Sequence, residues 1–196
     1  MISTNKSPLR RFTLTAAATM FTLVAAAGCA TSAPETAVDP GSTGDTATSD
    51  TASVADLSSP VTISHRGGAL VYPEESMEGF TASAQDGFLP EMDIQFLSDG
   101  TPVLIHDDTA DRTLNGATGP IRDLTLEQWD AATIANPTGG APAETVTLTE
   151  LLDELGGEVV LVPEIKPGAT SAEVDSVLDE FTERGLTASL IVQSFD

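Results

Sequence analysis

The sequence contains few cysteines, histidines and basic residues, and each shortage limits what the protein can be. Cys29 is the only cysteine among 196 residues, so the chain cannot form an internal disulfide. Eight lysines and arginines stand against 30 acidic residues, and the net charge of −22 argues against nucleic acid or an anionic membrane surface as a partner. The two histidines, His65 and His106, are the only side chains that ordinarily change charge near neutral pH.

Residues 1–28 have the pattern of a bacterial export signal. Three basic residues precede a short apolar stretch, 12–28, which ends in small residues directly before Cys29. This stretch is shorter than the roughly 20 residues that a membrane span needs. The Ala-Gly-Cys ending resembles the lipobox of bacterial lipoproteins. The resemblance implies that Cys29 is lipidated and anchors the protein outside the cytoplasmic membrane, by the lipid alone; simple secretion is the alternative.

Residues 29–59 are predicted to be the lipidated cysteine and a disordered tether. Residues 30–59 consist mainly of threonine, alanine, serine, aspartate, glycine and proline, and this composition buries too little apolar surface to fold. The folded domain is predicted over 60–196, which is long enough for one modest core. Removal of 1–28 leaves 5 basic and 30 acidic residues, so a basic residue on a strand stands out.

Strands and helices alternate over residues 60–196. The alternation predicts an α/β fold with a parallel sheet. Asp99-Gly100 predicts a tight turn between the second and third strands. The last helix is expected to bury Val174, Val177, Leu178 and Phe181, which are spaced three and four residues apart. The predicted strands are 61–65, 90–97, 102–106, 158–165 and 188–195, and the predicted helices cover 75–86 or begin after Thr125, Thr147 and Thr170.

Charged side chains gather on these strands and at their ends. Glu91 and Asp93 are two residues apart, as are Glu164 and Lys166, so each pair points to one side of its strand. Buried carboxylates are unfavourable unless they are paired or bound to a metal. Glu91, Asp93 and Glu164 therefore predict an oxygen site for Ca²⁺ or Mg²⁺. Lys166 would hold a second anion or neutralise Glu164.

Each of these residues also has a simpler interpretation. A strand-end carboxylate is usually solvated, a Glu–Lys pair can be structural, and a histidine can be an ordinary core or surface residue. Their coincidence favours a functional site. Two histidines suit proton transfer, a metal would polarise an oxygen, and Arg66 and Lys166 suit a phosphate. Together they indicate phosphoryl chemistry.

In chain order, six segments resemble the glycerophosphodiester phosphodiesterase family. The segments are Ile63-Ser-His65-Arg66-Gly67-Gly68, Tyr72-Pro73-Glu74-Glu75-Ser76, Glu91-Met-Asp93, Asp99-Gly100-Thr-Pro102-Val-Leu-Ile-His106-Asp107, Asp111-Arg112-Thr113 and Glu164-Ile-Lys166. The resemblance covers about residues 61–196. It implies a TIM-barrel-like (β/α)8 fold of the PLC-like phosphodiesterase type, and metal-dependent hydrolysis of glycerophosphodiesters to glycerol 3-phosphate and an alcohol.

The same resemblance implies the roles of individual residues. His65 and His106 would be the general acid and base, and Arg66 and Lys166 would contact the substrate phosphate. Glu74 would support the site from nearby. Glu91, Asp93 and Glu164 would bind one divalent cation, Ca²⁺ or Mg²⁺.

Two departures from the family pattern are visible. Glu75 replaces an asparagine and is expected to add negative charge beside an anionic substrate. Five strands are predicted where a TIM barrel has eight, so residues 60–196 are expected to be a partial barrel, truncated after about five strands, with unpaired edges. A non-catalytic surface lipoprotein that retains a metal or phosphate site, or an inactive fragment, is the alternative.

Overall fold

The computed structural model describes residues 51–195, so Cys29, the predicted export signal and most of the predicted tether lie outside the described residues. Strand β2 is the centre of the main sheet, and β1 and β7 pair with it in parallel while β3 pairs with it in antiparallel fashion. The helices and strands, in chain order and with η marking 3-10 helices, are η1 Val54–Asp56, β1 Ile63–Ser64, η2 His65–Gly67, α1 Met77–Gln85, β2 Leu89–Phe96, β3 Pro102–Leu104, β4 Leu114–Asn115, η3 Ile121–Asp123, α2 Leu126–Ala131, β5 Thr133–Ile134, β6 Ala143–Glu144, α3 Leu148–Leu155, β7 Val162–Ile165 and α4 Ser171–Glu183.

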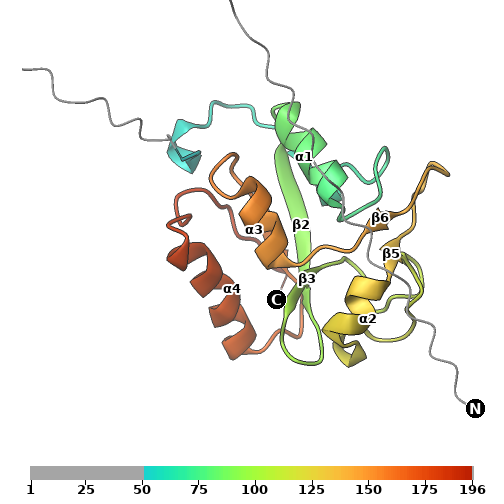
Figure 1. Ribbon diagram of the computed structural model, residues 1–196. Helices are drawn as coiled ribbons and strands as arrows, with labels where there is room; N and C mark the ends of the chain where they lie inside the picture. Colours follow the sequence, from blue (N-terminus) through green and yellow to red (C-terminus); the bar gives the residue numbers. More distant parts are fainter. Residues whose placement is uncertain (1–50, 196) are drawn as a thin grey trace, which may run out of the picture. The chain divides into compact units, whose positions relative to one another are not determined.

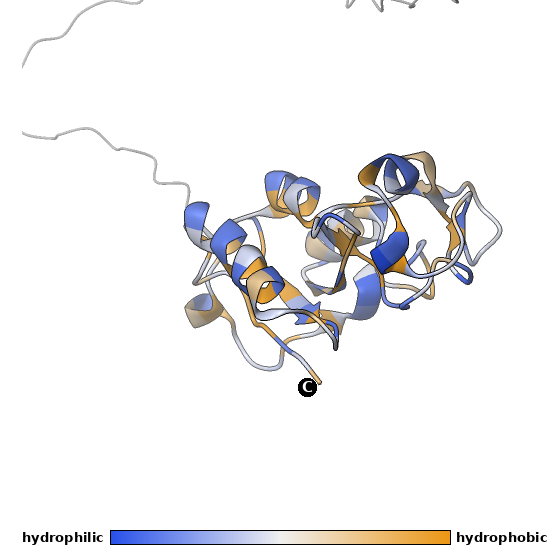
Figure 2. Cartoon of the chain, turned by 90° about the horizontal axis from the view of Figure 1, so that it is seen from below, coloured by the Kyte–Doolittle hydropathy of each residue, from blue (hydrophilic) through white to orange (hydrophobic). Residues whose placement is uncertain are grey.

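The side chains of β2 alternate between a helix-facing layer and the opposite face of the sheet. Met92 and Ile94 belong to a buried cluster that also contains Phe80 of α1, Leu151 of α3 and Phe181 of α4. These three helices lie around β2 (Figure 1). Their hydrophilic and hydrophobic residues alternate along each ribbon, as an amphipathic helix requires (Figure 2). The intervening residues of β2 are left for the other face, where the acidic side chains lie.

A second, smaller cluster forms around Trp129 of α2. It is built mainly from residues between β3 and α3, a segment that includes the three-stranded sheet β4-β5-β6, and it also contains Leu97 and Val103 of the β2–β3 hairpin. This segment contributes to the site only through the loop that leads into β4.

The prediction of a parallel sheet is wrong for the third strand. Asp99-Gly100 closes a tight hairpin, in which Gly100 has φ 88° and the Leu97 N–H donates to the Thr101 carbonyl at 3.0 Å. β3 therefore returns antiparallel to β2, with Ile94 opposite Leu104. The hairpin itself is the tight connection that the sequence predicted.

The predicted strand at 188–195 is not a regular strand. The segment runs parallel to β7 through two isolated bridges, Leu161 with Leu190 and Glu164 with Gln193. Pro163 lies between the bridges and has no N–H with which to continue the ladder. The neighbouring predicted strand, 158–165, forms a regular strand only over Val162–Ile165, which is β7.

Helix starts follow the sequence prediction closely. The capping boxes at Thr125, Thr147 and Thr170 are all formed, and each threonine accepts a hydrogen bond from the backbone N–H three residues on. Two details of the helix predictions are wrong. Leu178 of α4 is 40% exposed. Helix α1 begins two residues after the predicted position 75, because Glu75 has a left-handed φ of 57°.

The prediction that the tether extends to residue 59 is also wrong. The Ala52 N–H donates to the Gly157 carbonyl and the Val54 N–H to the Ala188 carbonyl, both at 2.8 Å. Ala52 and Leu57 pack on a buried cluster that contains Leu89, the first residue of β2, together with Val160 and Val162. Residues 51–57 therefore belong to the folded unit and cover the amino ends of its strands.

Leu57→Ala is expected to lower the free energy of unfolding by about 1–2 kcal/mol, less than the 2–5 kcal/mol typical of a fully buried leucine. The reason is that Leu57 is only partly buried in its cluster. Urea denaturation measures the change. Val54→Ala is the matched control, because Val54 is 39% exposed and its loss is expected to change stability by about 0.5 kcal/mol or less. If Leu57→Ala and the unaltered protein had equal free energies of unfolding, residues 51–57 would not be part of the folded unit.

Candidate active site

A cavity of about 590 Å³ opens beside the carboxyl ends of β1 and β7. It brings together both histidines, two of the three predicted metal ligands and one of the two predicted phosphate contacts. Its lining residues are Ile63, His65, Glu91, His106, Glu164, Lys166, Gln193 and Phe195. Segments distant in the chain thus converge as the sequence predicted.

The three predicted ligands form a compact acidic group. One carboxylate oxygen from each of Glu91, Asp93 and Glu164 lies within 4.8 Å of the other two. Their exposures are 2%, 1% and 5%, and Asp93 Oδ2 is buried with no hydrogen-bond partner. Three buried carboxylates fit a hard divalent cation, because one of their oxygens accepts no hydrogen bond and has only an ion-pair contact with Arg66. Within residues 51–195 this is the one group of acidic, histidine or cysteine side chains so arranged.

Both nearby cations are paired with these carboxylates. Lys166 Nζ donates to Glu164 Oε1 at 2.8 Å and to Asp93 Oδ1 at 3.3 Å, so it takes the neutralising position that was one of its two predicted roles. Arg66 Nε lies 3.3 Å from Asp93 Oδ2, and its Nη1 lies 3.5 Å from Glu74 Oε1. Arg66 also donates its backbone N–H to Glu91 at 2.7 Å.

A tight turn after β1 presents His65 and Arg66. Arg66 has φ 52°, a strained value for a non-glycine residue. Gly67 packs so closely on the start of α1 that an added Cβ would lie 2.9 Å from Phe80 Cδ1. The turn therefore requires glycine at this position, and its contact with α1 fixes where the two functional side chains emerge.

The two histidines differ in their surroundings. His65 is exposed at the cavity rim. His106 is less exposed, and its Nδ1 lies 2.8 Å from Asp107 Oδ1. No role was predicted for Asp107, although its position directly after a histidine was a usable signal.

Arg112, for which no role was predicted, holds two carboxylates of the site's surroundings. The Arg112 guanidinium donates to Glu74 through Nη1 at 2.9 Å and through Nη2 at 2.6 Å. It also binds Asp107, through Nη2 at 2.9 Å and through Nε. Two signals were available in the sequence: Arg112 is one of few basic residues, and it lies in the segment Asp111-Arg112-Thr113 that resembles the family.

Comparison with known proteins agrees with this geometry. The sequence model of the Glycerophosphoryl diester phosphodiesterase family matches residues 65–196. The chain belongs to this family. Its fold class is TIM-barrel-like, and the described strands supply part of such a barrel.

Relatives of the family match different shares of the chain. Human glycerophosphodiester phosphodiesterase 1 is 49% identical over 67 residues, which are 34% of this chain and 20% of the human protein. The glycerophosphodiester phosphodiesterase of Caldanaerobacter subterraneus subsp. tengcongensis is 32% identical over 142 residues, covering 68% of this chain and 57% of that protein. The crystal structure of glycerophosphodiester phosphodiesterase from Agrobacterium tumefaciens superimposes with a TM-score of 0.61 at 28% identity, covering 69% of this chain and 58% of that one. The chain thus spans less than two thirds of each.

Glu75, the departure from the family pattern, does not act as expected from the sequence. It is 1% exposed and does not line the cavity; instead its two carboxyl oxygens lie 3.2 and 3.4 Å from the Asp93 backbone nitrogen. Burial, together with the charge of Asp93, raises the pKa of Glu75 well above its usual value, which favours the neutral form. The expectation of an added negative charge beside the substrate is therefore wrong.

The metal-free protein is expected to lose stability as the pH rises from 4.5 to about 7. Burial raises the pKa of Glu91 from 4.5 to about 7, and the charges of Asp93 and Glu164 contribute to the rise. In this interval the native state keeps a proton that the unfolded state has released, so the free energy of unfolding falls with rising pH. Glu91 accounts for at most about 1.4 kcal/mol per pH unit.

Urea denaturation in the presence of a chelator, at several pH values across this interval, measures the effect. Glu91→Gln is the informative variant, because a side chain that cannot ionise should make the pH dependence shallower. Stability that rises over the interval, or a slope unchanged in Glu91→Gln, would contradict the assignment.

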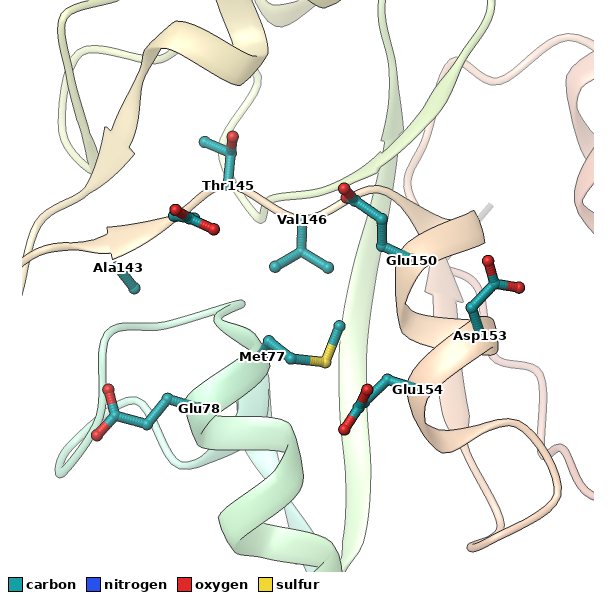
Figure 3. A pocket seen from close by; sticks show the side chains of 9 residues that line it. Met77, Glu78, Ala143, Thr145, Val146, Glu150, Asp153 and Glu154 are labelled. Carbon is teal, nitrogen blue, oxygen red and sulfur yellow. The ribbon is translucent and has the colours of Figure 1, made fainter. Parts of the chain in front are cut away.

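A second cavity, of about 530 Å³, lies between α1 and α3 (Figure 3). Carboxylates surround an apolar floor there, and the lining contains no histidine and no basic residue. Its lining residues are Met77, Glu78, Ala143, Glu144, Thr145, Val146, Glu150, Asp153 and Glu154. It lacks histidines and basic residues, the side chains that suit proton transfer and phosphate binding.

Proposed function

We propose that the protein hydrolyses glycerophosphodiesters to glycerol 3-phosphate and an alcohol, with one bound divalent cation, Ca²⁺ or Mg²⁺. The observation that carries the proposal is the cavity that His65 and His106 line together with Glu91 and Glu164. Membership of the family supports the reaction class, and the names of the relatives from human and from Caldanaerobacter support the substrate class.

In this proposal the histidines move the protons of the reaction. One accepts a proton from the attacking water as the water oxygen bonds to phosphorus. The other donates a proton to the alcohol oxygen as the bond between phosphorus and that oxygen breaks. The Asp107 carboxylate leaves Nε2 as the ring nitrogen with which His106 acts.

Glu91, Asp93 and Glu164 would hold the cation. When bound, the cation would supply electrostatic polarisation of a phosphoryl oxygen. Lys166 lines the cavity and would contact the anionic phosphate. Arg66 would have to break its ion pair with Asp93 or with Glu74 before its guanidinium could contact the phosphate. Glu74 would support the site by holding Arg66 and Arg112.

The test is release of glycerol 3-phosphate from glycerophosphocholine and glycerophosphoethanolamine by the full chain, with Ca²⁺ or Mg²⁺ added after exhaustive chelation. Turnover that depends on the cation supports the proposal. Cation binding without turnover would instead support the non-catalytic alternative, in which the site only retains a metal or a phosphate ligand. Calorimetry on the same samples separates the two outcomes.

We also propose that Cys29 is lipidated and anchors the protein on the outer side of the cytoplasmic membrane. The small residues before Cys29 and the composition of the following segment support this. Within residues 51–195, no helix is long and apolar enough to cross a membrane. Fractionation of cells that express the unaltered protein or Cys29→Ala is the test. Unaltered protein free in the medium would favour secretion instead.

A further inference from the structure

Two loops carry functional side chains of the proposed site, and each side chain contacts a carboxylate. His106, after β3, has its Nδ1 2.8 Å from Asp107 Oδ1. Arg66, after β1, has its Nη1 3.5 Å from Glu74 Oε1. Neither Asp107 nor Glu74 lines the cavity of the histidines; each instead contacts one of these two side chains.

Arg112, which lies on the same β3–β4 connection as His106, binds both of these carboxylates. Its planar guanidinium donates to both oxygens of Glu74, at 2.9 and 2.6 Å, and to both oxygens of Asp107. A guanidinium presents its donors in a fixed fork, so the two carboxylates cannot turn independently while it is bound to both. Arg112 therefore joins the loop of His106 to the loop of Arg66.

We propose that Arg112 is a positioning residue, which fixes the His106 ring through Asp107 and the Arg66 side chain through Glu74. The inference rests on the proposed function for its effect on turnover, but not for its effect on the ring. An ionised carboxylate can only accept, so Asp107 requires a proton on Nδ1 of His106. Nε2 is then the nitrogen left to exchange protons in the cavity.

Ion pairing by Arg112 holds the ionised Asp107 carboxylate in place. The Arg112 hydrogen bonds are the largest cause that lowers the pKa of Asp107, to about 2. Without them, the Asp107 side chain would be free to turn toward solvent. The His106 ring would then lose the partner that fixes both its orientation and its tautomer.

A purely structural role for Arg112 makes a different prediction. The Arg112 side chain is 49% exposed, and ion pairs at such exposure contribute little to stability. Arg184 offers a matched control, because it also binds two carboxylates, Asp153 and Glu180, each at 3.2 Å, on helices α3 and α4. Arg112→Ala and Arg184→Ala should therefore have similar melting temperatures, close to that of the unaltered protein.

The decisive measurement is the ¹⁵N spectrum of the histidine side chains, recorded about two pH units above the ordinary histidine pKa of about 6.5. The chain contains only two histidines, and His65→Gln assigns the signals. The unaltered protein and Arg184→Ala should show His106 protonated on Nδ1. In Arg112→Ala and Asp107→Ala, the Nδ1 proton should no longer be favoured. Arg112→Lys, which cannot hold both carboxylates with one ammonium, should resemble Arg112→Ala.

Kinetics supply the second measurement. Arg112→Ala should lower kcat for glycerol 3-phosphate release by about 10²-fold, the size of effect expected for a misplaced reacting group, whereas Arg184→Ala should not. An Nδ1 proton retained on His106 in both Arg112 variants would overturn the proposal, whatever the turnover. A shifted tautomer in a protein that shows no turnover would uphold the positioning role and refute the proposed function. If Arg112→Ala does not fold, Arg112→Lys decides.

Discussion

Replacement of His106 or His65 by alanine is expected to lower kcat for glycerol 3-phosphate release by about 10²–10⁴-fold, the usual contribution of a positioned acid or base. Both side chains line the cavity that contains Glu91 and Glu164, and no other histidine exists in the chain to replace either one. The effect should fall mainly on kcat, because neither histidine belongs to the acidic group that would bind the cation.

Steady-state kinetics with glycerophosphocholine measure this effect in His65→Ala and His106→Ala. Cation affinity, measured by calorimetry on the same samples, is the control and should stay within a few-fold of the unaltered protein. If one variant keeps its turnover, that histidine has a structural role. If both keep it, proton transfer does not pass through this pair.

Exhaustive removal of divalent cations is expected to abolish turnover, and Ca²⁺ or Mg²⁺ should restore it. In the same assay, Asp93→Asn should weaken cation binding at least tenfold. The reason is that Glu91, Asp93 and Glu164 are all buried and their oxygens lie within 4.8 Å of one another, so they repel unless a positive charge lies between them. Lys166 and Arg66 supply part of that charge in the described structure.

Titration calorimetry with Ca²⁺ and with Mg²⁺ measures the loss of affinity. Asp175→Asn is the matched control, because it makes the same chemical change at an exposed position of α4. Full turnover after exhaustive chelation would remove the cation from the proposed mechanism. Equal affinities of Asp93→Asn and Asp175→Asn would place the cation elsewhere.

Local sequence signals predicted local structure well. Thr147 and Glu150 lie three residues apart and cap one helix end, so their pattern is legible without knowledge of the rest of the fold. Glu91 and Asp93 were likewise predictable as a pair, because residues two apart on a strand share a face. The parallel register that places Asp93 opposite Glu164 then brings the third carboxylate to them.

Features that depend on contacts between residues distant in the chain could not be predicted from the sequence. The composition of residues 51–57 predicts disorder, but their backbone N–H groups find partners at Gly157 and Ala188, more than a hundred residues away. A glutamate such as Glu75 is ordinarily expected at the surface, but here the fold buries it against β2. The bridge that Arg112 forms to Glu74 depends on two loops meeting, and no periodicity encodes that meeting.

The position of residues 51–57 against the folded unit has a practical consequence for attaching the protein to a surface. These residues contact Leu89, at the amino end of β2, whereas His65 follows the carboxyl end of β1. A biotin coupled to a cysteine introduced at Thr51, in a chain whose Cys29 is replaced by alanine, would therefore hold the protein by the end of the sheet opposite its histidines. A sensor chip coated in this way would leave the cavity facing the flowing ligand. Coupling at Leu70, which is 94% exposed and follows shortly after the His65–Gly67 turn, would instead hold the protein by its histidine end.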